Sequence, residues 1–226
     1  MGGLPSAYLF LLGLASGLTV LSVTAYRRLS PRWLKWLLVI TGCFTLSRYV
    51  TLALFATSPD PQRVWFLRPC YFATSIGLTL PSAFAIDQLV RHPAMSPKKL
   101  LGWYAPFLMA FLAAMLFSSP TFIPDRVMGW TLRLNTGWRW WFSILHAVFI
   151  ALFLGASLMI FTKAPLAHIR LALLGLASAQ GALGVDGLLV MCGRWYFRPF
   201  LYTEMLALLA IWYAYDRSIE LQRSSA

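Results

Sequence analysis

The sequence predicts an all-α membrane protein: a single transmembrane domain over residues 1–226, folded as a bundle of seven membrane-spanning helices. Two observations lead to this fold class. Hydrophobic residues make up 59% of the chain and charged residues 12%, with a mean hydropathy of +0.69. A helix needs roughly 20 apolar residues to cross a hydrocarbon core of about 30 Å. Runs of that length lie at about 6–26, 33–57, 64–90, 100–118, 138–162, 166–191 and 198–215.

The distribution of basic residues predicts the orientation of this bundle. The formal net charge of +12 would suggest nucleic acid as the partner of a soluble protein, but here the basic residues lie at the ends of apolar runs, where the lipid bilayer accounts for them. We therefore expect no nucleic-acid partner. An outside N-terminus, a cytoplasmic C-terminus and a multi-pass location in the bacterial cell membrane follow. The loops then expected in the cytoplasm carry Arg27, Arg28, Arg32, Lys35, Arg91, Lys98, Lys99, Lys163 and Arg170.

The first two spans differ in polarity. Gly13, Ser16 and Gly17 give the first span a small-residue face suited to close packing, and this span holds no ionisable group. Two arginines follow it and no basic residue precedes it, which predicts an uncleaved anchor. The second span carries Arg48 about 13 Å below its outer end, at 1.5 Å per residue. Because that depth is too great for the side chain to reach the interface, an acidic partner is expected.

The third and fourth spans are joined at the inner side and followed by the longest loop. Asp87 and Arg91 close the third span four residues apart, which predicts an ion pair at its inner edge. The fourth span is almost wholly apolar, with Pro106 as its one irregularity. A loop at about 119–137 comes next on the outer side, and its length suggests a lid over the mouth of the bundle.

The last three spans carry the remaining polar groups. His146 lies two to three turns below the outer surface in the fifth span, and Glu204 lies in the second turn of the seventh. The sixth span is rich in glycine and other small residues, yet it holds Gln180 and Asp186. Small residues let neighbouring helices approach, and charges inside a membrane usually face a bundle interior. We therefore expect the sixth span to be the central helix.

The three cysteines leave two interpretations open. Cys70 and Cys192 both fall near outer helix ends, so a disulfide between the third and sixth spans is conceivable. The alternative is that these residues and Cys43 are buried free thiols.

Polar groups of several spans share one depth, which predicts a polar cavity that opens to the outside and binds a small ligand or lipid. Arg48 would neutralise one carboxylate there, and His146 could share a proton with another. Structural interpretations stand beside this one: Arg48 and Asp186 could form an ion pair that joins the second and sixth spans, and Glu204 could bond an arginine at the interface. The predicted ligand-binding residues are Arg48, Arg68, Tyr71, His146, Gln180, Asp186, Tyr202 and Glu204.

Several cofactor chemistries do not fit the sequence. A retinal protein needs a lysine within its seventh helix, whereas every lysine here lies at an inner helix end. Haem held by two histidines is disfavoured because His92 and His168 lie near the inner edge and His146 in the outer half. Zinc held by His146, Asp186 and Glu204 has no motif with close ligand spacing to support it. The sequence therefore predicts neither a metal site nor catalytic residues, and it indicates no particular cofactor.

The layout of the chain resembles the seven-helix sensor regions found before bacterial histidine kinases. The features that carry the resemblance are the segment from Pro165 to Arg170 leading into a glycine-rich sixth span, and a last span that runs out through Tyr213-Ala-Tyr-Asp-Arg217. The resemblance implies that the outer cavity binds a ligand and that the seventh helix passes a signal inward. Because no kinase domain follows Ala226, it implies a separate cytoplasmic signalling partner.

Two other functions remain open. Segments 65–74 and 195–204 have similar sequences. An internal repeat, in which a linker span joins two groups of three spans, would produce this similarity. Independent selection of the same residues at the membrane interface would produce it too. Such a repeat is similar in plan to the SWEET sugar transporters. A transporter should carry polar groups through both halves of its pathway, whereas a receptor needs them mainly in the outer half. In the third interpretation, the chain is a structural or accessory membrane subunit whose charges form internal ion pairs only.

Overall fold

A computed structural model of the chain describes residues 3–29, 31–90, 96–125, 128–164, 166–192 and 201–224. These residues form a helical bundle with one small β-hairpin, which confirms the predicted all-α membrane architecture in its main features. The long helices are α1 (Gly3–Tyr26), α2 (Arg32–Thr57), α6 (Pro97–Phe117), α7 (Thr136–Lys163), α8 (Ala167–Met191) and α9 (Leu201–Ser224).

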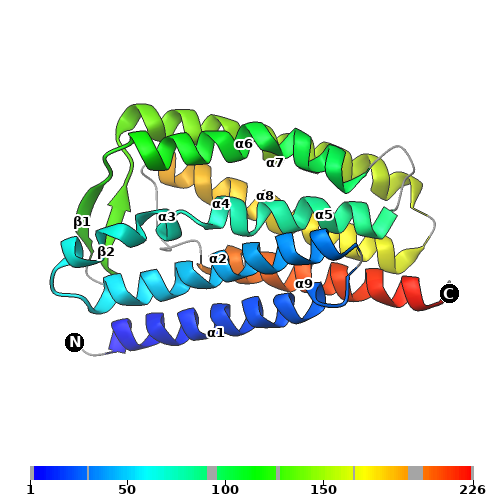
Figure 1. Ribbon diagram of the computed structural model, residues 1–226, viewed down its shortest axis with the longest axis horizontal. Helices are drawn as coiled ribbons and strands as arrows, with labels where there is room; N and C mark the ends of the chain where they lie inside the picture. Colours follow the sequence, from blue (N-terminus) through cyan, green and yellow to red (C-terminus); the bar gives the residue numbers. More distant parts are fainter. Residues whose placement is uncertain are drawn as a thin grey trace.

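The helices run along one common axis and form an elongated bundle (Figure 1). The start of α1 and the β-hairpin lie at one end, here called the hairpin end, and the end of α9 lies at the other, the C-terminal end (Figure 1). Helix α9 packs against α1, α5 and α8, while α2 pairs with α1 and α7 packs against α8 and α6. Helix α9 therefore joins parts of the chain that are far apart in sequence.

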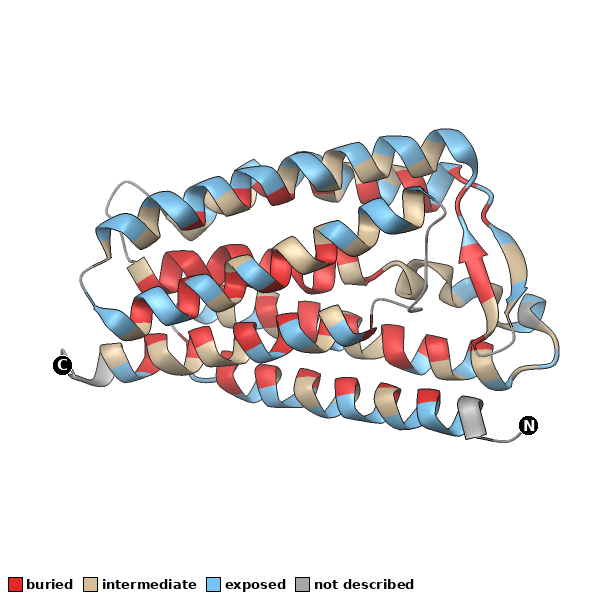
Figure 2. Cartoon of the chain, turned by 180° about the vertical axis from the view of Figure 1, so that it is seen from behind, coloured by how far each residue is buried: buried red, intermediate tan, exposed pale blue. Residues whose placement is uncertain are grey.

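Six helical segments among the described residues are long and apolar enough to cross a membrane. Buried residues gather on the inward faces of the helices, and exposed residues follow the outward faces (Figure 2). Many of the exposed side chains are large and apolar, among them Phe10, Ile40, Trp103 and Leu152, as expected for surfaces in contact with lipid. The seventh helix, α9, packs in the same bundle but is not one of these six, and residues 198–200, where its span was expected to begin, lie outside the described residues.

The third apolar segment is not the continuous helix predicted for 64–90. It consists of a 3-10 helix, η1 (Pro61–Leu67), followed by three α-helical pieces, α3 (Arg68–Tyr71), α4 (Thr74–Gly77) and α5 (Thr79–Val90). Proline explains the last break, because the ring of Pro81 has no N–H to donate to the carbonyl four residues earlier, that of Gly77, and its ring crowds that carbonyl.

The later part of this broken segment, α4 and α5, and not α8, occupies the centre of the bundle. Every residue from Thr79 to Leu89 is buried, whereas most of α8 is exposed or half-buried. The prediction that the sixth span is central was therefore wrong. The small residues of α8 do allow close approach, but they serve contacts with α7 and α9 on its two sides.

Gly77 shows how tightly α4 is pressed onto α2. A Cβ atom at this position would overlap the Oγ1 atom of Thr45 and would lie 3.1 Å from its Cβ atom and 3.5 Å from its Cα atom. Thr45 is held in place because its hydroxyl donates to the carbonyl of Thr41 at 2.9 Å. Only a residue without a side chain fits this contact.

The loop predicted at 119–137 contains a β-hairpin that the sequence analysis did not predict. Strands β1 (Thr121–Asp125) and β2 (Gly129–Arg133) pair in antiparallel register, from Thr121 opposite Arg133 to Asp125 opposite Gly129. Gly129 has a φ of +69°, and a side chain there would collide with the backbone of Phe55 and Ala56 in α2. The hairpin is therefore anchored to the end of α2.

Two smaller predictions can be compared with the structure. Cys43, Cys70 and Cys192 are all free thiols, so the conceivable Cys70–Cys192 disulfide is not formed; none of the three is buried. The expected ion pair of Asp87 involves Arg91, which lies outside the described residues.

We predict that Gly77→Ala lowers the stability of the protein by about 1–3 kcal/mol, the usual cost of forcing an extra methyl group into a packed interior. Gly102→Ala in α6 is the matched control, because nothing lies within 4 Å of the position of its Cβ atom. The free energy of unfolding in mixed micelles, obtained by titration with a denaturing detergent, measures both. Equal stability of the two variants would contradict the close approach of α4 to α2.

Candidate functional site

A buried ion pair between Arg48 of α2 and Glu204 of α9 lies in the half of the bundle nearer the hairpin. The Nε and Nη2 atoms of Arg48 donate to Oε1 of Glu204 at 3.1 and 2.7 Å. The exposed fractions are 4% for Arg48 and 0% for Glu204. The acidic partner expected for Arg48 therefore exists, and it belongs to the last helix.

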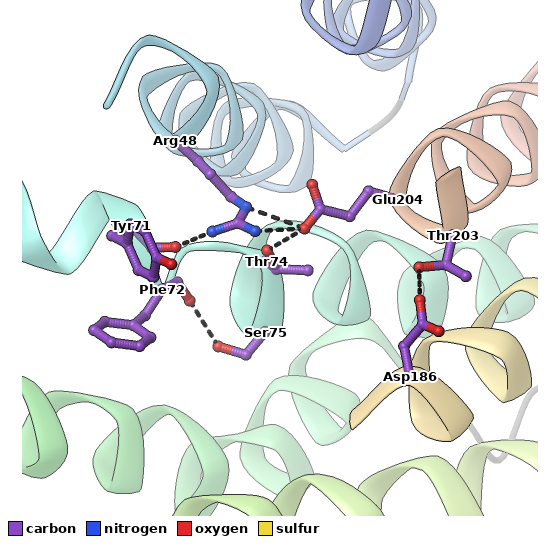
Figure 3. A network of polar contacts seen from close by, with 8 residues as sticks. All are labelled: Arg48, Tyr71, Phe72, Thr74, Ser75, Asp186, Thr203 and Glu204. Atoms are coloured by element: carbon purple, nitrogen blue, oxygen red, sulfur yellow. Dashed lines mark hydrogen bonds and ion pairs between the residues drawn. The ribbon is translucent and has the colours of Figure 1, made fainter. Parts of the chain in front are cut away.

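The same arginine also binds the broken segment. Its Nη1 atom donates to the backbone carbonyl of Tyr71, and the hydroxyl of Thr74 donates to Oε1 of Glu204 at 2.7 Å (Figure 3). Tyr71 ends α3 and Thr74 begins α4, so both contacts fall where the helix is interrupted. An interruption leaves backbone carbonyls without helical partners, and a guanidinium group with five N–H donors can satisfy one of them while it pairs with a carboxylate.

A cavity of about 500 Å³ lies beside this ion pair. Its wall is formed by residues of α2, the broken segment, β2, α7 and α8, and most of these residues are apolar. On the α8 side the lining includes Gly181, Gly184 and Gly187; a Cβ atom at Gly184 would lie 3.1 Å from Cδ1 of Ile150 in α7, whereas nothing lies within 4 Å of the Cβ position at Gly187. A cavity of this size and character is typical of small-molecule sites.

His146 lines the α7 side of the cavity. Its ring lies 5.7 Å from that of Phe107, and its Nδ1 atom is buried without a hydrogen-bond partner among the described residues. Ser143 lines the cavity three residues earlier on the same face of α7. An unpaired buried nitrogen is a cost to the fold, and because Nδ1 is buried, it is the rest of the His146 ring that faces the cavity.

The structure brings only some of the eight predicted ligand-binding residues together. Arg48, Tyr71 and His146 line the cavity, and Glu204 is joined to it through Arg48. Gln180 is fully buried next to the cavity floor, where its Nε2 atom donates to the hydroxyl of Ser82 at 2.8 Å.

The other three predicted residues do not line this cavity. Asp186 accepts a hydrogen bond of 2.6 Å from the hydroxyl of Thr203, so the alternative ion pair between Arg48 and Asp186 was wrong (Figure 3). Tyr202 is 58% exposed and faces away from the bundle interior. The guanidinium carbon of Arg68 lies 4.8 Å from the centre of the Trp65 ring.

Sequence reasoning missed the residues that shape the cavity. Thr74 and Ser75 carry short hydroxyl side chains whose position depends on the break in the third segment, and Pro69 and Pro81 were the available signal for that break. The glycines of α8 were noted as packing residues, but which of them face α7 could not be read without the rotation of the helix. Among the described residues, no group of three or more His, Cys, Asp or Glu side chains could hold a metal ion.

The chain matches no family model, no curated protein and no solved structure. The resemblance to sensor regions of histidine kinases therefore remains a prediction from the layout of the helices.

We predict that Glu204→Gln destabilises the protein by roughly 3–5 kcal/mol, because it leaves the buried guanidinium of Arg48 without a counter-charge. Asp186→Asn is the matched control: its amide oxygen can still accept from Thr203, so we expect a loss of less than about 1 kcal/mol. The double variant Arg48→Met with Glu204→Leu should recover part of the stability, because it removes both charges at once. Unfolding in mixed micelles measures all three.

The ion pair would lose its central role if Glu204→Gln were no more harmful than Asp186→Asn. It would also lose that role if the effects of the two substitutions at Arg48 and Glu204 simply added.

Proposed function

We propose that this protein is a membrane sensor that binds a small ligand or lipid in the cavity beside Arg48 and signals through a separate partner at the C-terminal end of the bundle. One observation carries the proposal: a wall residue of the cavity, Arg48, is ion-paired with Glu204 in the first turn of α9. A ligand that shifts Arg48 must therefore act on α9 as well.

Helix α9 has the length needed to carry such a shift across the membrane. Its 24 residues extend about 36 Å at 1.5 Å per residue. Its first turn holds Glu204, which is bonded to the cavity residue Arg48, and it ends at the C-terminal end of the bundle (Figure 1). A helix is stiff along its axis, so a displacement at Glu204 is expected at the far end too.

Hydrogen bonds on the side of the cavity toward the C-terminal end favour a binding site over a transport path. Thr79 lines the cavity, and its hydroxyl lies 2.7 Å from that of Tyr104; the hydroxyl of Tyr215 donates to the carbonyl of Pro81 at 2.8 Å. These groups and Gln180 are buried, and each is bonded across helices. A ligand would have to break these bonds to continue toward the C-terminal end.

A second candidate function is transport, and the break in the third segment favours it. Transporters often place interrupted helices at their substrate sites, because the interruption exposes backbone groups that bind substrate. Here the carbonyls of Tyr71 and Phe72 are already bonded, because they accept from Arg48 and from the hydroxyl of Ser75. We therefore rank transport below sensing.

The basic residues support an orientation with the hairpin end outside. Positively charged residues accumulate on the cytoplasmic side of membrane proteins. The described residues that carry this charge near the C-terminal end of the bundle are Arg27, Arg28, Arg32, Lys35, Lys98, Lys99, Lys163 and Arg170. In this orientation the cavity lies in the outer half of the membrane.

We predict that a membrane-impermeant maleimide labels Cys192 in intact cells, because its exposed thiol caps α8 at the hairpin end. The control is Glu220→Cys in a chain whose native cysteines are replaced by serine, since Glu220 is exposed near the C-terminal end of α9. It should react only after the cells are opened. The reverse pattern would invert the orientation and place the cavity on the cytoplasmic side.

We predict that filling the cavity uncouples α9 from the ligand. Gly187→Leu should do so without a clash, because nothing lies within 4 Å of the position of its Cβ atom. Gly155→Leu is the matched control, since it is equally open but does not line the cavity. Spin labels at Arg28→Cys and Glu220→Cys report the distance across the C-terminal end, before and after a lipid extract of host membranes is added to stripped protein.

A sensor should change this distance in the parent protein and in Gly155→Leu, but not in Gly187→Leu. An unchanged distance in all three, although native mass spectrometry shows a bound molecule, would overturn signalling through α9. Movement of that molecule across the membrane of liposomes that contain the parent protein would then establish transport.

A further inference from the structure

We infer that the cavity selects a neutral amphiphile, a single hydrocarbon chain whose one hydroxyl or similar uncharged head group bonds to His146. This inference rests on the proposed function, since it names the ligand class of the same cavity. It follows from three properties of the wall: its apolar surface, the compensation of its only permanent charge, and the hydrogen bonds its polar groups already make.

The apolar part of the wall requires an apolar ligand body. Side chains of Phe142, Ile150, Leu154, Leu183 and Leu188 line the cavity between α7 and α8. Each apolar group moved from water to such a surface is stabilised in proportion to the area it buries. A sugar or an amino acid would instead lose hydrogen bonds to water that these residues cannot replace.

The charge of the wall is already neutralised. Among the residues that line the cavity, Arg48 is the only one that is permanently charged, and its three nitrogens bond to Glu204 and to the carbonyl of Tyr71. An anionic head group would have to compete with Glu204 for the guanidinium, while that carboxylate repels it. A cationic head group would find no acidic side chain in the wall. A neutral head group meets neither obstacle.

Most hydroxyl groups of the wall already form hydrogen bonds within the protein. Thr74 donates to Glu204, Ser75 donates to the carbonyl of Phe72 at 3.0 Å, and Thr79 bonds within the floor. Neither ring nitrogen of His146 forms a hydrogen bond among the described residues, and since Nδ1 is buried, a ligand in the cavity would meet the ring at Nε2. Neutral imidazole nitrogen either donates or accepts, depending on the tautomer, and a ligand hydroxyl can match both states.

Photoreactive probes with one chain and different head groups test this inference. Four twelve-carbon chains with a diazirine at the same carbon end in a hydroxyl, a methyl, a carboxylate or a trimethylammonium group. Each is added to the full chain in nanodiscs, and mass spectrometry measures how much label the peptides of α7 and α8 carry. We expect the alcohol to label them about 2 to 13 times more than the methyl-ended chain, the range set by one net hydrogen bond.

Two variants assign the preference to the cavity and to its histidine. Gly187→Leu should abolish the labelling by every probe, while Gly155→Leu should leave it unchanged. His146→Leu should keep the labelling by the methyl-ended chain and remove the preference for the alcohol, a result that a merely structural role of His146 would not give.

The outcomes separate this inference from the proposed function. Preference for the carboxylate or the trimethylammonium chain would overturn the neutral head group, although the cavity would still be a binding site. Equal labelling by all four probes, retained in His146→Leu, would overturn the role of His146. Labelling that Gly187→Leu does not reduce would mean that the probes report only bilayer lipid contact, and it would overturn binding in the cavity itself.

Discussion

The buried ion pair of Arg48 and Glu204 is the constraint on which the rest of this bundle depends. Neither charge could be buried in a membrane protein alone, because an unpaired ion in an apolar interior costs several kcal/mol. Each is therefore compatible with the fold only where the other is present. Since the two residues belong to α2 and α9, 156 positions apart, this requirement fixes how the two ends of the chain meet.

The pair also explains why an interrupted helix is tolerated at the centre of the bundle. A break in a helix that lies within a membrane leaves polar backbone groups that water cannot reach, and they must be satisfied by protein. Arg48 supplies the donor for the carbonyl of Tyr71, and Glu204 accepts from Thr74 on the other side of the break. The ion pair and the interruption thus satisfy part of each other's hydrogen bonding: Oε1 of Glu204 takes these contacts, while Oε2 has no partner among the described residues.

The sequence was informative where a property depends on position along the chain. Runs of apolar residues located six of the seven expected spans within a few residues of the helical segments, because the thickness of the bilayer determines how long each run must be. The depths of Arg48, His146 and Glu204 followed from the same rise per residue. These depths led to the prediction of one cavity that holds Arg48 and His146, and both residues line the cavity in the structure.

The sequence was less informative where a property depends on rotation about a helix axis. Asp186 and Glu204 have similar depths, so depth alone could not decide which of them faces Arg48; the structure pairs Glu204 with it and turns Asp186 toward Thr203. The centre of the bundle was misjudged for a related reason. Small residues in α8 indicate close packing but do not say how many neighbours a helix has, and the prolines of the third segment were the better guide to what is unusual there.

The combination of a cavity and an internal charge pair argues for coupling over a purely structural role. If the charges served only to join helices, packing could fill the space beside them, and α8 would need no run of glycines facing α7. The open volume costs dispersion energy, and the unpaired nitrogen of His146 costs a hydrogen bond. In the function we propose, a ligand that fills the cavity would restore the lost dispersion contacts and press on Arg48, whose ion pair with Glu204 would pass the displacement to α9.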